Sequence, residues 1–252
     1  MKALPLFKSQ YSLGRSILTL EAAGASLHRG PDSIIDLAIE HKLKKVFLID
    51  DSMSGFLQAY KNLTEQKIKL VFGLRMTTCP NMDEKTEDSR HKSCKYVVLC
   101  KNENGYRRLI KIASDSSRIG FYYEPRIDFK TLRKYWSDDL ILCVPFYDSF
   151  LYKNLLTDSV CIPDFDFTTP VFFEEENDLP FDHLIQNRIE DYCSKNHYDV
   201  ISTKSIYYAN KKDFKAYLTF RCINKRSTLD RPELDHMGSH EFCLESWEGQ
   251  NA

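Results

Sequence analysis

Acidic side chains stand directly after two apolar segments that are typical of buried β-strands. Asp50 and Asp51 follow residues 46–49, and three glutamates at residues 174–176 follow residues 171–173. Carboxylates in such positions could hold a divalent cation for phosphoryl chemistry. Acids after a strand also commonly cap the next helix or close a turn. We prefer this structural interpretation for the two aspartates, with a residual single-metal site as the alternative, and we interpret the glutamates as a solvated rim.

The other nucleophilic and metal-binding side chains show no catalytic spacing. Seven histidines follow no ligand pattern, and eight cysteines include no C-x-x-C pair, so neither a zinc site nor a disulfide framework is expected. In a reducing compartment, the cysteines are expected to act as small buried hydrophobes. The motifs G-x-x-x-x-G-K-[ST], G-x-G-x-x-G and G-x-S-x-G are absent from the sequence, which gives nucleotide hydrolysis and serine hydrolysis no support.

Composition and charge are those of an ordinary globular protein. The 252 residues are 42% apolar and 28% charged, which allows one sizeable core. A formal net charge of −1 provides no global basic field for DNA or a membrane, so nucleic-acid contact would require a local patch. No apolar run approaches the roughly 20 residues that span a bilayer, and the N-terminus does not resemble a signal peptide. We expect a cytoplasmic protein without membrane contact.

A local basic patch surrounds residues 101–128, near the middle of the chain. Its candidate nucleic-acid contacts are Arg107, Arg108, Lys111 and Arg126. A solvated helix face is the preferred interpretation, and contact with phosphate or nucleic acid is the alternative. The aromatic residues 121–123 could stack on bases. We prefer a role in fixing the link between a helix and a strand.

Short apolar segments alternate with longer segments of helical periodicity. Strands are predicted at residues 4–7, 46–49, 70–74, 96–99, 140–144, 171–173 and 200–202. Helices are predicted at about residues 31–39, 55–65, 103–114, 129–135, 146–156, 181–196 and 211–224. This alternation favours a mostly parallel sheet with helices outside it, and seven such units favour closure into a barrel.

Two polar segments interrupt this pattern. Residues 78–93 are predicted to form a flexible loop, and residues 225–240 an irregular tail. We find no internal repeat and no clear linker. The expected organisation is therefore one barrel over residues 1–224, followed by an irregular C-terminal segment at residues 225–252.

Several segments together resemble the polymerase and histidinol phosphatase (PHP) domain that begins bacterial DNA polymerase III alpha subunits. The strongest match joins residues 101–110 (KNENGYRRLI) to residues 121–128 (FYYEPRID). Residues 9–12 (SQYS) resemble the family's opening Ser-x-Tyr-Ser, and residues 68–73 resemble its Ile-Lys-x-Ile-x-Gly strand. The C-terminal segment resembles the exit towards a polymerase palm. The resemblance implies an α/β fold, a distorted seven-stranded (β/α) barrel of PHP type.

Catalytic members of this family hold metal ions at the ends of barrel strands with His, Asp, Glu and Cys. The matching positions here are Leu6, Lys8, Asp50, Asp51, Arg75, Lys95, Phe146, Ser205 and Tyr207. Only the two aspartates keep a carboxylate, and the three cations would repel a metal ion. We expect these cations to pair with the aspartates instead, in a network that replaces the metal. No metal and no cofactor are therefore expected.

The resemblance places the chain in DNA replication without the family's chemistry. It implies a catalytically inactive, metal-free PHP-like domain of a DNA polymerase III alpha-type protein, which is not an enzyme on its own. Its partners would be other polymerase domains, a proofreading subunit or DNA. Two alternatives stay open: a divergent metal-dependent phosphoesterase or 3′–5′ exonuclease, and a DNA-binding accessory module.

Overall fold

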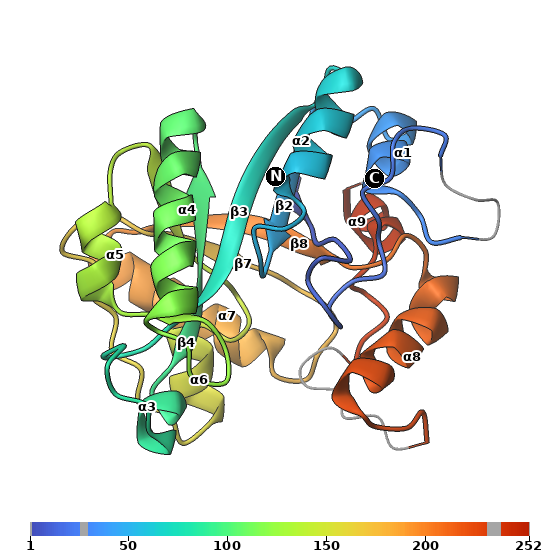
Figure 1. Ribbon diagram of the computed structural model, residues 1–252. Coiled ribbons are helices and arrows are strands. Elements are labelled where there is room, and N and C mark those ends of the chain that lie inside the picture. The colour runs from blue at the N-terminus through green and yellow to red at the C-terminus, as the bar shows by residue number, and fades with distance from the viewer. Residues whose placement is uncertain (1, 26–29, 231–237, 252) are drawn as a thin grey trace. The chain divides into compact units, whose positions relative to one another are not determined.

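A computed structural model describes residues 2–25, 30–230 and 238–251 (Figure 1). The strands in this part of the chain are β1 (Leu4–Phe7), β2 (Lys45–Asp50), β3 (Lys69–Thr78), β4 (Cys94–Cys100), β5 (Arg126–Ile127), β6 (Leu140–Val144), β7 (Val171–Glu174) and β8 (Asp199–Ile206). The α-helices are α1 (Ile34–Glu40), α2 (Phe56–Glu65), α3 (Glu87–His91), α4 (Glu103–Arg118), α5 (Phe129–Tyr135), α6 (Phe150–Leu156), α7 (Asp182–Asn196), α8 (Phe214–Lys225) and α9 (Leu244–Asn251). Each predicted strand and helix overlaps one of these elements.

The strands pair in the order β2-β1-β8-β7-β6-β4-β3-β5, and β2 also pairs with β3. Seven strands therefore form a closed ring of hydrogen-bonded neighbours, which confirms the predicted α/β fold class of PHP type. The pairing is mostly parallel, as predicted, but β4 runs antiparallel to both β3 and β6. No helix among the described residues is long and apolar enough to cross a membrane.

Contacts divide the chain into two compact units. The first comprises residues 1–72, 175–180 and 202–252, and the second comprises residues 73–174 and 181–201. The predicted domain boundary after residue 224 does not coincide with this division, because the C-terminal segment belongs to the first unit.

In the first unit, β1 lies between two parallel neighbours. Its residue Leu6 is in register with Phe47 of β2 and with Ser205 of β8. The C-terminal segment contains helix α9 rather than only irregular structure, so that prediction was wrong for Leu244–Asn251. The indole Nε1 of Trp247 in this helix donates to the carbonyl of Ala3 at 2.7 Å, which ties the segment to the start of β1.

In the second unit, the structure at the start of α4 explains the amino-acid sequence of residues 101–110. Asn102 caps the helix by accepting from the amide of Gly105 at 3.0 Å, and its own amide group donates to Asp139 Oδ1 at 2.7 Å. A Cβ atom at Gly105 would lie 2.4 Å from the carbonyl oxygen of Asp139. This segment therefore needs a cap at one position and a residue without a side chain three positions later.

Residues 78–93 are more ordered than a flexible loop. They continue β3 to Thr78, form helix α3 and lead into β4 at Cys94. Thr86 caps α3 by accepting from the amide of Ser89 at 3.2 Å. The polar composition of this segment reflects a short, exposed helix of five residues, which is too short to give an apolar periodicity.

Candidate functional site

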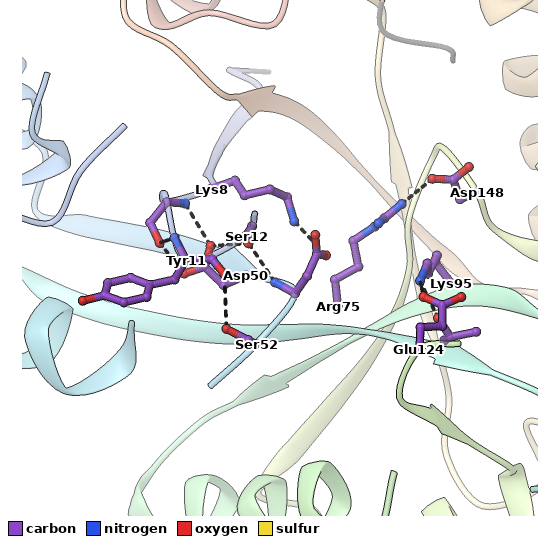
Figure 2. Close-up of polar contacts among 12 residues, drawn as sticks. Lys8, Tyr11, Ser12, Asp50, Ser52, Arg75, Lys95, Glu124 and Asp148 are labelled. Atoms are coloured by element: carbon purple, nitrogen blue, oxygen red, sulfur yellow. Dashed lines mark hydrogen bonds and ion pairs between the residues drawn. The ribbon is translucent and has the colours of Figure 1, made fainter. Parts of the chain in front are cut away.

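The carboxylate of Asp50, at the end of β2, organises the turn that follows β1. Asp50 is fully buried, and it accepts from the Ser9 amide at 2.9 Å, the Ser9 hydroxyl at 2.6 Å and the Ser12 hydroxyl at 2.7 Å. Ser12 in turn accepts from the amide of Asp51 at 2.9 Å (Figure 2). The serines of the Ser-x-Tyr-Ser segment thus hold a carboxylate. Asp50 has the structural role that we preferred, although it closes this turn instead of capping α2, which begins after Gly55.

The electrostatic setting of Asp50 depends on its burial and on Lys8. Burial raises the pKa of Asp50, whereas Lys8 and the hydrogen bonds from Ser9 and Ser12 act in the opposite direction. Lys8 is only 4% exposed, and its Nζ lies 3.0 Å from Asp51 Oδ1. The predicted pairing of Lys8 with Asp51 is therefore present. A buried ammonium occupies a position where the resemblance implied a metal ligand.

The positions of the family's last ligands hold a hydrogen-bond network and an aromatic stack. Ser205 on β8 donates its hydroxyl to Glu175 Oε1 at 2.7 Å and its amide to Oε2 at 3.1 Å. Glu175 is 5% exposed, so our interpretation of the three glutamates as a solvated rim was wrong for this residue. Tyr207 is buried and stacks on Phe242, with ring centroids 5.5 Å apart.

Two further ion pairs lie within the second unit, and both use carboxylates that the sequence did not single out. Arg75 on β3 contacts Asp148 Oδ2 at 2.5 Å, and Lys95 on β4 contacts Glu124 Oε2 at 2.6 Å (Figure 2). Lys95 also donates to Thr77, its cross-strand neighbour. We had predicted Asp50 and Asp51 as partners of these cations, and Asp148 and Glu124 take that role.

The surroundings of Glu124 favour its charged carboxylate. Burial by itself would raise the pKa of Glu124, but Lys95, Thr77 and Arg75 together hold it below its ordinary value.

Phe146, at the position of the family's cysteine ligand, is buried and meets Tyr147 edge to face, with centroids 4.8 Å apart. An apolar ring at this position has no donor for a metal ion.

In the signature segment, residues 101–128, two of the four candidate nucleic-acid contacts lie on a solvated helix face. Arg107 and Lys111 are exposed on α4, and Arg107 pairs with Glu103 one turn earlier at 2.5 Å. Arg108 is half-buried and donates to the carbonyl of Tyr135 at 3.1 Å, which joins α4 to α5. Arg107 and Lys111 agree with the preferred interpretation of the patch, whereas Arg108 serves the packing of the two helices.

Arg126 is a correction to the candidate nucleic-acid contacts. Only 1% of the residue is exposed, and its guanidinium donates to the Gly120 carbonyl at 3.2 Å, the Ser89 hydroxyl at 3.1 Å and the Glu84 carbonyl at 3.0 Å. It also lies over the ring of Tyr122, 5.0 Å from the centroid. Arg126 therefore holds the link after α4 against α3, and it has no free face for a phosphate.

The side chains at these positions do not fit a cluster of divalent metals. Among the residues that the structure describes, no group of three or more His, Cys, Asp or Glu side chains could hold a metal ion. Asp50 accepts three hydrogen bonds from serines, and Asp51 already contacts an ammonium. A metal ion at either carboxylate would have to displace these donors.

Comparison with known proteins agrees with this fold. Residues 26–150 match the model of the PHP domain. DNA polymerase III subunit alpha of Aquifex aeolicus is 25% identical over 213 residues, which covers 79% of this chain and 18% of the relative. The same subunit of Campylobacter jejuni is 26% identical over 245 residues, covering 88% of this chain and 20% of the relative.

A shorter region is more similar. The subunit of Chlamydia pneumoniae is 37% identical over 92 residues, or 36% of this chain and 7% of the relative. The chain thus spans about a fifth or less of the length of these relatives. It contains a PHP domain, and over most of its length it is a distant homologue of DNA polymerase III alpha subunits.

Proposed function

We propose that this chain is a non-catalytic PHP domain with a structural or partner-binding role in DNA replication. The observation that carries the proposal is the replacement of metal-ligand types by buried cations in ion pairs. Lys8 pairs with Asp51, and within the other unit Arg75 pairs with Asp148. On this view the domain is a pseudoenzyme that needs no metal and no cofactor.

The physical reason is that a positively charged side chain and a metal ion repel each other and compete for the same carboxylate. A phosphoesterase of this family needs metal ions that generate hydroxide and stabilise charge on the phosphoryl group. The ammonium of Lys8, 3.0 Å from Asp51, already supplies positive charge to that carboxylate. A divalent ion at the same carboxylate would be repelled by Lys8 and would lose a ligand to it.

The retained fold supports the proposed role in DNA replication. The relatives are named DNA polymerase III subunit alpha, which points to replication in the cytoplasm as the setting. The capped start of α4 and the buried Arg126 preserve the shape of the domain without serving chemistry. We therefore propose other polymerase domains or a proofreading subunit as partners, with DNA contact as the less supported option.

The test is metal content measured together with phosphoesterase activity. Protein purified without chelator is analysed for bound metals, and it is then assayed on a phosphodiester and on 3′-ended DNA with added manganese. We expect less than about a tenth of an equivalent of tightly bound metal and no activity above that of Asp51→Ala. Asp83→Ala changes an exposed aspartate and serves as the matched control.

Two outcomes would overturn the proposal in favour of the alternatives. Stoichiometric metal and an activity that is lost in Asp51→Ala, but kept in Asp83→Ala, would indicate a divergent phosphoesterase or exonuclease. DNA binding that weakens with salt and is reduced in a variant lacking the side chains of Arg107 and Lys111 would indicate a DNA-binding accessory module.

A further inference from the structure

A cavity opens beside the C-terminal half of α7, and three carboxylates line it. Its volume is about 630 Å³, which is within the range of ligand-binding pockets, and all its lining residues belong to the second unit. Glu174 ends β7, Glu190 lies on α7, and Asp199 begins β8. No lysine or arginine is among the described residues that line the cavity. The cavity therefore presents negative charge, and it shares no residue with the metal-ligand positions.

The end of α7 adds to this negative charge. The helix has 15 residues, and the carbonyls of its last turn carry partial negative charge. His197 caps this end in a left-handed conformation with a φ of 57°, and its amide donates to the carbonyl of Cys193. Both residues line the cavity. A positively charged group is thus the ligand that this end of the helix favours.

The lining suits an organic cation better than a metal ion. Among the described residues, no three His, Cys, Asp or Glu side chains are placed so that they could hold a metal ion, so the three carboxylates do not converge on one point. Ile189 and Val200 add an apolar wall. A lysine or arginine side chain matches this lining, because its aliphatic stem can pack on the apolar wall while its charged end meets the carboxylates.

The thiol in the cavity contributes no covalent chemistry. Cys193 is 3% exposed, and burial, together with the charge of Glu174, raises its pKa to about 11. A thiol of this kind stays protonated near neutral pH and is a poor nucleophile. The cavity is therefore suited to binding and not to reaction.

The start of β8, next to the cavity, is uncovered on both faces. Residues 199–202 are all exposed, including Val200 at 40% and Ile201 at 41%. Successive side chains of a strand point to opposite faces, so neither face of this stretch is buried. The register of β8 with β1 begins only at Thr203. An uncovered strand of this kind is a template along which an extended chain can lie.

We propose that the cavity binds a lysine or arginine side chain from an extended segment of a partner protein, and that this segment lies along the start of β8. The charged end of the side chain would lie among Glu174, Glu190 and Asp199. A free polyamine could occupy the cavity, but it would leave Ile201 without a contact, which is why we favour a protein segment. The inference rests on the proposed partner-binding role, to which it gives a place and a chemical preference.

The test is peptide binding to the full chain, measured by fluorescence anisotropy at about 0.1 M salt. The probe is a fluorescein-labelled peptide of about eight residues that alternates arginine with valine. We expect saturable binding of this peptide and none of a peptide with glutamate in place of arginine. Glu190→Gln combined with Asp199→Asn should weaken binding roughly fivefold or more, because two charges at the cavity are removed. Asp83→Asn combined with Asp191→Asn removes two exposed charges outside the cavity and should leave the affinity within about twofold.

A second pair of variants tests the cavity without changing its charge. Ser194→Trp on α7 places a large side chain in the cavity and should weaken binding roughly tenfold, because the arginine side chain loses its space. Leu184→Trp enlarges an exposed side chain on the same helix outside the cavity and should have no effect. The comparison of the two peptides on wild-type protein remains decisive even if a variant fails to fold.

Three outcomes would overturn this inference. These are no binding of the arginine peptide, equal weakening by the two double variants, and displacement of the peptide by spermidine at the peptide's own concentration. The first would mean that the cavity takes no such segment, the second that the attraction is non-specific, and the third that the site is one for a small polyamine. Metal content and phosphoesterase activity are measured without peptide, so a metal-free, inactive protein that binds no peptide contradicts this inference alone. A metal-loaded, active protein that binds the peptide would contradict the proposed lack of catalysis alone.

Discussion

Replacing Arg126 by methionine tests whether the signature segment serves the fold or a ligand. The methionine keeps much of the apolar stem but removes every guanidinium donor. Without the guanidinium, the buried Gly120 carbonyl and the buried Ser89 hydroxyl no longer accept these hydrogen bonds. The Glu84 carbonyl is only partly buried and can turn to water instead.

The expected loss follows from these acceptors. A buried acceptor deprived of its donor costs about 1–3 kcal/mol, and two such groups dominate here. We therefore expect Arg126→Met to lower the free energy of unfolding by about 2–3 kcal/mol, or the melting temperature by roughly 5–10 °C. Arg126→Lys should recover only part of this, because an ammonium cannot reproduce the planar fork.

Urea denaturation of the variants beside Arg107→Met provides the measurement. Arg107 is exposed on the same segment, and among the described residues its ion pair is with Glu103 on its own helix, so its replacement should change stability by less than about 0.5 kcal/mol. An Arg126→Met protein as stable as Arg107→Met would refute the reasoning, since the three hydrogen bonds would then contribute nothing to the fold.

Two further predictions concern the helix start and the ion pairs. Gly105→Ala should destabilise the protein by about 1–3 kcal/mol, because the new Cβ would lie 2.4 Å from the Asp139 carbonyl oxygen. Gly249→Ala on α9, where a Cβ would meet nothing within 4 Å, should be neutral or stabilising, and equal thermal shifts for the two would contradict this. The pKa of Glu124 is lowered in the folded state, so its contribution to stability is present above the unfolded value of 4.5 and is lost as pH falls through the lower folded value. The difference in urea stability between wild type and Glu124→Gln should therefore shrink on acidification below about pH 4.5, and a constant difference down to pH 3 would show that Glu124 is not charged in the pair.

The sequence predicted the ends of strands better than it predicted which charged side chains form ion pairs. Lys8 and Asp51 follow neighbouring strands β1 and β2, so their pairing could be predicted from strand order alone. Asp148 and Glu124 lie in connecting segments, and Asp148 has a positive φ of 62°, which an apolar pattern does not predict. A hydrophobic period identifies a strand but does not determine which loop carboxylate reaches its end.

Two other features were hidden for different reasons. Arg126 looked like part of a basic patch because sequence shows charge but not burial, and its partners Ser89 and Gly120 come from separate elements. Glu175 lies between two other glutamates, which suggested a solvated run. Only the return of β8 places the amide and hydroxyl of Ser205 against its carboxylate.

The ion pairs also make the present state hard to leave by single substitutions. Replacing Lys8 by a neutral residue would remove a cation that lies 3.0 Å from Asp51. Replacing Asp51 would remove a carboxylate that contacts the buried ammonium of Lys8. Only the Lys8 end of this pair is buried, whereas the Asp51 side chain is 29% exposed, so breaking the pair should cost less than the roughly 3–5 kcal/mol of a fully buried pair. Changes at such a pair are therefore better tolerated when both residues change together. In the comparison of related sequences, residues 8 and 51 should covary as a unit, and so should residues 75 and 148.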